Sequence, residues 1–136
     1  MPRLPPVAEI MQEVVSSLGA SVKMAERRGV QRESIVIDPG IGFGKSQEQN
    51  LELLARLEEF SAAFPDLPIL IGTSRKSFIG RILADESCTP APTEDRTFGT
   101  VAAVAAAVLK GASIVRVHEV KSTVESIKVL DAIKRS

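Results

Sequence analysis

Short β-branched segments alternate with longer segments of helical periodicity, and this alternation restricts the fold more than any other feature of the sequence. The β-branched segments cover residues 34–38, 68–72 and 113–117, and they are largely apolar. Apolar strands of this kind are typical of a parallel sheet covered by helices. Because crossovers between parallel strands are right-handed, the carboxyl ends of all strands open on one side. The sequence therefore predicts an α/β fold in the order α-βα-βα-βα, with the polar strand ends along one rim.

The helical segments are marked by apolar residues at helical spacing, by capping residues and by terminating glycines. They are residues 7–28 ending at Gly29, a segment opened by a capping box of Ser46 and Gln49, a short segment from about Phe78, residues 101–109 ending at Gly111, and a last segment capped by Ser122 and Glu125. Residues 85–95, rich in Pro and Thr, are predicted to form a loop.

Length and composition exclude several classes of protein. The 136 residues suit one domain, and a hydrophobic fraction of 44% with 25% charged residues is typical of a globular chain. Lys plus Arg equals Asp plus Glu at 17 each, and Trp and Tyr are absent, so neither a basic surface nor base-stacking rings favour a nucleic-acid partner. No apolar run reaches the roughly 18 residues of a membrane span. The single Cys88, with His118 as the one histidine, offers neither an internal disulfide nor a zinc cage, and a reducing, cytoplasmic location is expected.

The number of strands predicts a partial molecule. Three strands cannot close a barrel, and a complete (β/α)8 barrel takes about 250 residues. The chain also begins with a helix, so the strand before that helix is expected to be missing.

A glycine-rich motif, DPGIGFGK at residues 38–45, follows the first strand. A Walker A loop would need Gly where Pro39 stands, and a dinucleotide fingerprint would need Gly where Lys45 stands, so both are excluded. The motif is then either a tight strand-to-helix turn with a solvated lysine or a ligand-binding loop. Asp38 favours the second interpretation. A carboxylate at the end of an apolar strand costs desolvation energy unless it is paired, and such carboxylates bind donor-rich heterocycles.

Two further motifs follow the second and third strands. TSRKS at residues 73–77 offers Arg75 or Lys76, with the backbone amides of the next helix, as an anion or ring-stacking site; the alternative is helix capping by Ser74 or Ser77 beside exposed cations. Arg116 and His118 in RVH are two residues apart on a strand, so they project to the same side and suit a pyrophosphate. The alternative there is a buried histidine satisfied by backbone, with the arginine paired to an acid.

These motifs, taken in order, resemble those of the dihydropteroate synthase family over nearly the whole chain. The resemblance rests on IDPGIGFGKS…N, GTSRKSFIG and R..GT.AAVAAAV..GA.IVRVHEV. Members of that family are cytoplasmic (β/α)8 barrels, commonly homodimers and sulfonamide targets. They condense 6-hydroxymethyl-7,8-dihydropterin pyrophosphate with para-aminobenzoate and release pyrophosphate, usually with Mg²⁺. The resemblance implies that residues 1–136 are the C-terminal half of such a pterin-binding barrel.

The resemblance also assigns roles to residues of this sequence. It implies that Asp38 and Lys76 are catalytic, that the other substrate-binding positions include Gly72, and that a cation pair holds the pyrophosphate. The implied contacts are Asp38 on the pterin ring, Lys76 on the pterin and the aminobenzoate pocket, Phe43 near the aminobenzoate, Arg75 and Ser77 bordering both regions, and Arg116 with His118 on the pyrophosphate.

None of the family's first-half motifs occurs here, so the resemblance places the Mg²⁺ ligand in the missing N-terminal half. The isolated chain is therefore expected to be inactive. One alternative is a methyltetrahydrofolate methyltransferase-type pterin domain, which the SRK and RVH motifs disfavour. Another is a non-catalytic half-barrel that assembles with itself. Self-association is expected in either case, because unpaired sheet edges and apolar strand residues would otherwise face water: Ile35, Ile37, Ile69, Ile71 and Ile114.

Overall fold

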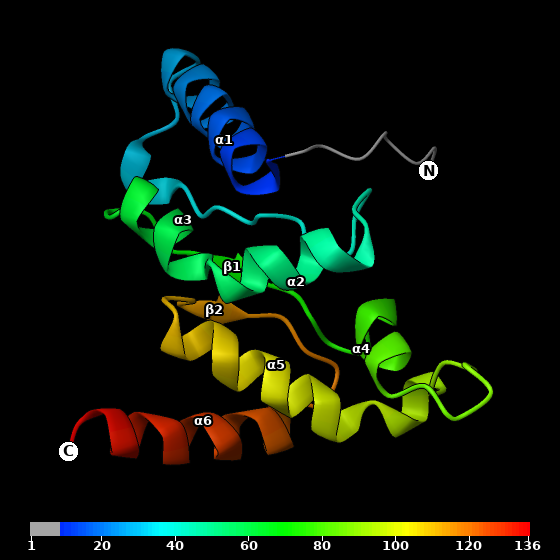
Figure 1. The fold of residues 1–136 in the computed structure, drawn as a ribbon. Coiled ribbons are helices and arrows are strands. Elements are labelled where there is room, and N and C mark those ends of the chain that lie inside the picture. Colours follow the sequence, from blue (N-terminus) through cyan, green and yellow to red (C-terminus); the bar gives the residue numbers. More distant parts are fainter. Residues whose placement is uncertain (1–8) are drawn as a thin grey trace.

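The computed structural model describes residues 9–136, which form a row of helices around a small parallel sheet (Figure 1). The elements in chain order are α1 (Ile10–Arg27), the 3-10 turn η1 (Arg32–Ser34), α2 (Gln47–Ala55), α3 (Leu57–Ala63), β1 (Leu70–Ile71), α4 (Ser77–Ile82), η2 (Thr93–Asp95), α5 (Thr97–Leu109), β2 (Ile114–Val115) and α6 (Val120–Lys134). In Figure 1, α1 lies at one end of the row and α6 at the other, with the strands between α2 and α5.

The sheet is parallel, as predicted, but its strands are shorter than predicted. Strand β1 pairs with β2 in the register Leu70 to Ile114, and the segment before the glycine-rich motif joins β1 through a single parallel bridge between Ile37 and Ile69. Only Ile37 of the predicted strand at 34–38 is therefore paired. The turn η1 takes up Ser34 at one end of that segment, and Pro39, which has no N–H to donate, follows at the other. The chain is thus an α/β domain in which three segments lie side by side in chain order.

The core lies between the strands and the helices that precede and follow them. Leu57 and Phe60 of α3 are completely buried, and the rings of Phe60 and Phe64 pack with their centres 5.3 Å apart. Three strand isoleucines are also buried: Ile37, Ile69 and Ile71. Ile114, by contrast, is 40% exposed.

Most helix ends agree with the sequence prediction, but two helix starts do not: α5 begins at Thr97, before the predicted Val101, and α6 begins before Ser122. The capping box of Ser46 and Gln49 opens α2, and Gly29 follows α1 with a positive φ of 93°. Residues 7 and 8, where the first helix was predicted to begin, lie outside the described residues. The predicted cap by Ser122 and Glu125 is wrong. Helix α6 starts earlier, at Val120, and the Ser122 hydroxyl donates back to the Glu119 carbonyl from within the first turn.

The helix that was predicted to run on from Ser46 is interrupted once, at Arg56. Its backbone (φ −106°, ψ 22°) ends α2 and begins α3, while its guanidinium pairs with Glu52, Glu59 and Glu9. Among residues 9–136, no helix is both long and apolar enough to cross a membrane.

Candidate functional site at the strand carboxyl ends

The three strand-end motifs lie next to one another, as predicted from the parallel order of the strands. Lys76 Nζ donates to the Ile41 carbonyl at 2.9 Å and lies 4.1 Å from the centre of the Phe43 ring. Ser74 Oγ lies 2.8 Å from His118 Nδ1, which joins the second motif to the third. The Arg116 guanidinium packs over Gly72, where an added Cβ would lie 3.4 Å from Nη2.

The glycine loop, residues 38–45, is stabilised by hydrogen bonds between its own residues. Asp38 Oδ1 accepts a hydrogen bond from Gly40 N at 2.8 Å, and Lys45 Nζ donates to the carbonyls of Gly40 (2.7 Å) and Phe43 (3.0 Å). Lys45 is therefore not a solvated lysine. Burial is the main cause that lowers its pKa; repulsion by Lys76 adds to this and attraction by Asp38 opposes it.

Asp38 lies where the sequence predicted, but it is more exposed to solvent than predicted. Its side chain is exposed, so the argument from desolvation of a strand-end carboxylate is wrong for this position. The chain turns out of the sheet directly after Ile37, which leaves the carboxylate beside an open cavity of about 270 Å³ between α1 and the glycine loop. Phe43 and Lys45 line the same cavity. Asp38 therefore faces a space large enough for a bicyclic ring.

A second cavity, of about 210 Å³, is lined by Lys76 and Arg116 together with His118. We call it the cationic cavity, and it is lined by Gly72, Ser74, Lys76, Arg116, Val117 and His118. No ion pair involves Arg116 within the described part of the chain, so the alternative of an arginine paired to an acid is not found. Burial lowers the pKa of Lys76 most, Arg116 lowers it further, and Asp38 opposes both. Crowding of cations in one hollow favours an anionic ligand.

Ser74 orients the histidine of this cavity. Its hydroxyl accepts the backbone N–H of His118 at 3.2 Å and lies within hydrogen-bond distance of Nδ1. Nε2 makes no hydrogen bond within residues 9–136. The imidazole is exposed, so the alternative of a buried histidine satisfied by backbone is not found either. A histidine fixed through one nitrogen presents the other to a ligand.

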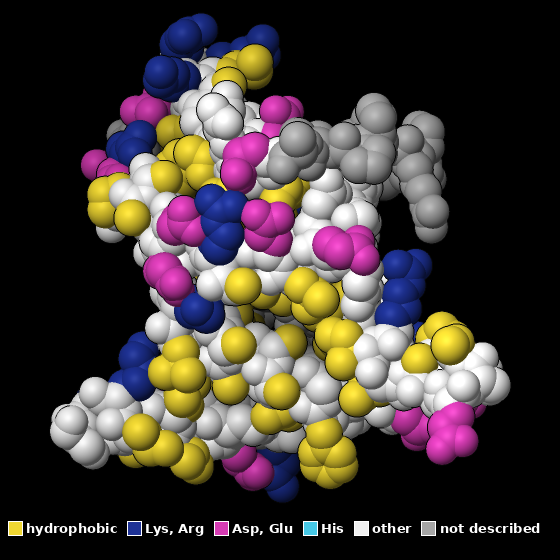
Figure 2. Space-filling view, viewed as in Figure 1, with side chains coloured by type: hydrophobic (Ala, Val, Ile, Leu, Met, Phe, Trp, Pro, Cys, Tyr) yellow, Lys and Arg dark blue, Asp and Glu magenta, His cyan; other side chains and the backbone are white. Residues whose placement is uncertain are grey.

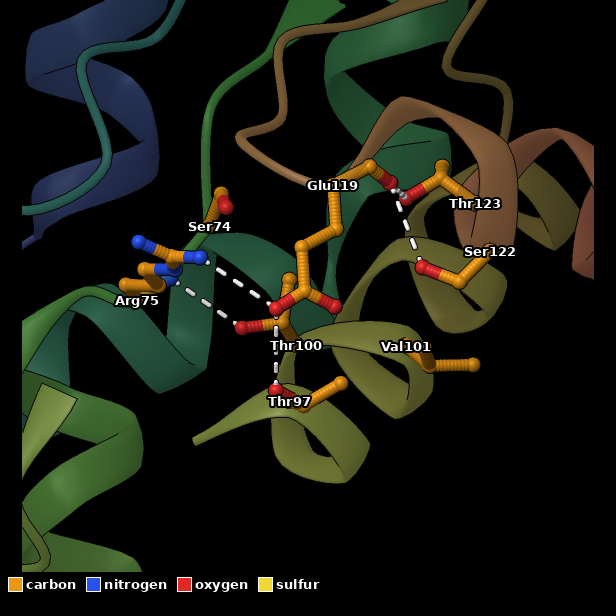
Figure 3. A pocket seen from close by; sticks show the side chains of 8 residues that line it. All are labelled: Ser74, Arg75, Thr97, Thr100, Val101, Glu119, Ser122 and Thr123. Atoms are coloured by element: carbon orange, nitrogen blue, oxygen red, sulfur yellow. Dashed lines mark hydrogen bonds and ion pairs between the residues drawn. The ribbon is translucent and has the colours of Figure 1, made fainter. Parts of the chain in front are cut away.

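Arg75 faces away from the cationic cavity. Its backbone has a positive φ of 57°, its N–H donates to Thr100 Oγ1 at 3.1 Å, and its carbonyl accepts from Arg96 Nη1 at 2.8 Å. Figure 3 shows its guanidinium directed at Glu119, with Nη2 and Oε1 3.2 Å apart. A hydroxyl of α5 donates to the same carboxylate oxygen, from Thr97 at 3.2 Å.

The hollow drawn in Figure 3 is small and is already filled by this hydrogen-bonded network. Ser77 is the exposed first residue of α4, whose N-cap is Lys76 without a side-chain cap, so the helix-capping alternative for Ser74 and Ser77 is not found. Within the described residues, no group of three or more His, Cys, Asp or Glu could hold a metal ion.

Three residues that hold this site in place were given no role from the sequence. Arg96 and Thr100 fix the backbone of Arg75, and Asn50 accepts from Gly42 N at 2.8 Å. Asn50 and Arg96 stand within the stretches that carry the family resemblance, and that was the signal that could have drawn attention to them. Their partners are far away in the sequence, so pattern alone did not reveal what they do.

Fold and site together define a parallel α/β domain that has a carboxylate-ended glycine loop and a cationic cavity at adjacent strand ends, which is the usual ligand side of such folds. Comparison with known proteins agrees with this class. Residues 3–118 match the family model described as pterin binding enzyme, and the chain belongs to that family.

Individual relatives are similar over almost all of this chain. The dihydropteroate synthase of Bacillus subtilis is 42% identical over 92% of the chain and 41% of its own length, and that of Escherichia coli K12 is 39% identical over 97% and 44%. The solved dihydropteroate synthase of Xanthomonas albilineans in complex with 7,8-dihydropteroate superposes with a TM-score of 0.89 at 36% identity, covering 100% of this chain and 49% of that one. The chain therefore spans less than half the length of the curated relatives named here.

Proposed function

We propose that this chain supplies pterin-, aminobenzoate- and pyrophosphate-binding residues for the synthesis of 7,8-dihydropteroate, and that the complete enzyme is a (β/α)8 barrel. The observation that carries the proposal is the position of Lys76. Its side chain contacts Phe43 of the glycine loop on one side. On the other side it lines the cationic cavity together with Arg116 and His118. Similar solved structures support the ligand class, since they include dihydropteroate synthases with pteroic acid and with 4-aminobenzoic acid.

In this reaction, the amine nitrogen of para-aminobenzoate attacks the methylene carbon attached to the pterin ring. The new N–C bond forms, the C–O bond to pyrophosphate breaks, and the nitrogen gives up a proton to solvent or to the departing pyrophosphate. Asp38 would accept hydrogen bonds from the N–H groups of the pterin edge. Arg116 and His118 would stabilise the charge that develops on the leaving group, because fixed donors act most strongly where charge accumulates.

Lys76 would serve both halves of the reaction. Its ammonium stands over the Phe43 ring, a cation–π arrangement at 4.1 Å, and lines the cavity of Arg116. From there it could donate to the pterin and keep Phe43 oriented toward the aminobenzoate. Lys76 of the SRK motif thus lines one anion-binding cavity with Arg116 and His118 of the RVH motif, and a methyltransferase acting on methyltetrahydrofolate would not need such a cavity.

The residues described here do not fit a Mg²⁺ ion. Asp38 is the one carboxylate in the glycine loop, its Oδ1 is hydrogen-bonded to Gly40 N, and no acidic cluster of metal-binding size accompanies it within residues 9–136. We therefore assign no step to the metal and propose that its ligands lie outside this set of residues.

Calorimetry with a pterin tests the proposal most simply. Asp38→Asn removes the charge but keeps the size of the side chain, and losing one member of a charged contact weakens binding by about 2–5 kcal/mol where the contact is desolvated. Asp95→Asn, an exposed carboxylate on η2, is the matched control and should bind as the parent does. Affinity of the Asp38 variant within twofold of the parent would show that the assignment is wrong.

The pyrophosphate site is tested separately. Pyrophosphate affinity should fall in His118→Ala, because the imidazole is one of the donors that line the cationic cavity. It should also fall in Arg116→Ala. A pyrophosphate affinity that is unaffected by both changes would contradict this part of the proposal.

We also propose that the chain associates with a second copy of itself through α5 and α6. Figure 2 shows hydrophobic side chains gathered over these two helices, whereas charged side chains are mixed among those of α1 to α3. The exposed apolar residues of α5 and α6 include Phe98 (90% exposed), Leu109 (57%), Val120 (62%), Val129 (63%) and Ile133 (66%). Large apolar patches of this kind are typical of association surfaces.

Sedimentation at micromolar concentration tests this association. The parent should sediment as a dimer, and the double variant Val129→Asp with Ile133→Asp should sediment as a monomer. Met24→Asp, at an apolar position on α1 that is 56% exposed, should leave the dimer intact. A monomeric parent would contradict the proposal.

A further inference from the structure

One peptide unit, between Ile41 and Gly42, joins a buried asparagine to the lysine at the centre of the site. The N–H of this peptide donates to Asn50 Oδ1 at 2.8 Å. Its carbonyl accepts from Lys76 Nζ at 2.9 Å. The N–H and C=O of a trans peptide point in opposite directions within one rigid plane, so the orientation of the plane fixes both partners together.

Asn50 is a rigid anchor for this peptide. Its side chain is 5% exposed, and it stands on α2 among residues held by the capping box of Ser46 and by the buried Leu53 and Leu54. The glycine loop, by contrast, has little regular structure to hold it. Gly42 has a φ of 87°, in the region that favours glycine, and an added Cβ there would lie 2.9 Å from Lys76 Cδ. The lysine stem therefore rests directly on the peptide that Asn50 orients.

We propose that Asn50 is a positioning residue for Lys76: by fixing the Ile41–Gly42 peptide, it holds the lysine ammonium over Phe43 and at the edge of the cationic cavity. The consequence for ligand binding rests on the proposed function, whereas the position of the lysine does not. A lysine side chain has four rotatable bonds and loses much freedom when it is held in one place. Misplacement of a reacting or binding group by about 1 Å costs on the order of 100-fold in rate, so a fixed acceptor for the ammonium matters.

The test is the chemical reactivity of Lys76 toward an acetylating reagent, followed by peptide mass spectrometry. In Asn50→Leu, which removes the acceptor while keeping the size of the side chain, Lys76 should label several-fold faster than in the parent. In Asn50→Asp, which keeps an acceptor for Gly42 N, it should label at or below the parent's rate. Lys128, exposed on α6, is the internal reference, and Glu48→Leu on the same turn of α2 is the matched control.

A variant that has lost helical circular dichroism relative to the parent has lost its general fold and is replaced by Asn50→Ser, because Lys128 is exposed in the folded chain and does not report unfolding. Hydrogen exchange of the Gly42 amide in the parent provides a measurement that needs no variant. That amide should be protected relative to the amide of Gly44, which makes no hydrogen bond within the described residues, and exchange as fast as that of Gly44 would overturn the inference. Unchanged labelling of Lys76 in a folded Asn50→Leu would also overturn it.

Calorimetry with a pterin, run in parallel, separates this inference from the proposed function. If the parent binds no pterin but Asn50→Leu still exposes Lys76, the proposed function fails and the positioning role stands. If the parent binds pterin, Asn50→Leu should lower the pterin affinity at least tenfold in the parent background. The same substitution should lower it less than twofold in the Lys76→Met background. An equal loss of affinity in both backgrounds would reveal a general structural effect and would overturn the inference.

Discussion

Replacing Arg96 by methionine should destabilise the turn that carries Lys76. The half-buried Arg96 guanidinium donates to the Arg75 carbonyl at 2.8 Å and to the Ala91 carbonyl at 2.9 Å, and it lies flat against Gly80. Methionine preserves most of the stem but makes neither hydrogen bond. The first bond is the more important one, because it holds a non-glycine residue at a positive φ of 57°.

The expected loss is about 2–3 kcal/mol in the free energy of unfolding. A hydrogen bond from a charged donor contributes about 1.5–3 kcal/mol, and the partial exposure of Arg96 places its two bonds at the low end of that range. With a urea slope of roughly 1–3 kcal/mol per molar, the unfolding midpoint should fall by about 0.7–3 M. Circular dichroism at helical wavelengths is the suitable probe, since the chain contains no Trp or Tyr.

Two comparisons make this prediction specific. Arg81→Met, at an exposed arginine on α4, should change stability by less than about 0.5 kcal/mol. Gly80→Ala would stabilise an ordinary helix by up to about 1 kcal/mol. Here it should destabilise, because the new Cβ would lie 2.6 Å from Arg96 Nε. Equal stability of Arg96→Met and Arg81→Met would refute this account of the turn.

Three other changes have expected outcomes. Phe60→Ala should lower the free energy of unfolding by about 3–5 kcal/mol, because Phe60 is completely buried, whereas Leu51→Ala at a 39% exposed position should cost much less in the same urea titration. The pKa of Lys76 is lower in the folded chain than in the unfolded chain, so the unfolded chain binds more protons at pH values between the two, and the free energy of unfolding should rise with pH there. Urea titrations from pH 8 to pH 10.5 should show a shallower rise for Lys76→Met than for the parent. Identical slopes would contradict the burial of Lys76. Ser46→Ala should cost about 1 kcal/mol through loss of the capping box, but Ser122→Ala should be nearly neutral because that hydroxyl caps no helix; equal effects would mean that α6 begins where the sequence predicted.

The sequence predicted those features that arise from local pattern and from the handedness of the chain. The order of helices and strands, the parallel sheet and the capping box of Ser46 all follow from periodicity and capping chemistry. The meeting of Lys76 with the glycine loop, and of Ser74 with His118, follows from the rule that parallel strands end on one side. That rule needs no knowledge of side-chain packing.

The features that the sequence did not predict depend on contacts between distant residues. The strand before the glycine loop pairs only at Ile37, because η1 and Pro39 leave it little length for a ladder. The direction of Arg75 is set by Glu119 and Arg96, which belong to other segments. Asp38 is exposed because the chain leaves the sheet directly after Ile37, and Pro39 was the one local signal of that course.

A nuclear magnetic resonance titration of the chain with 6-hydroxymethyl-7,8-dihydropterin pyrophosphate tests the claim that the three strand-end motifs form one binding site. The backbone amides of residues 40–45, 72–77 and 116–118 should shift together and follow a single dissociation constant, because one ligand spans the glycine loop and the cationic cavity. Amides of the outer face of α6 should not move. Shifts that saturate at different ligand concentrations for the three motifs, or that occur at only one of them, would contradict the claim.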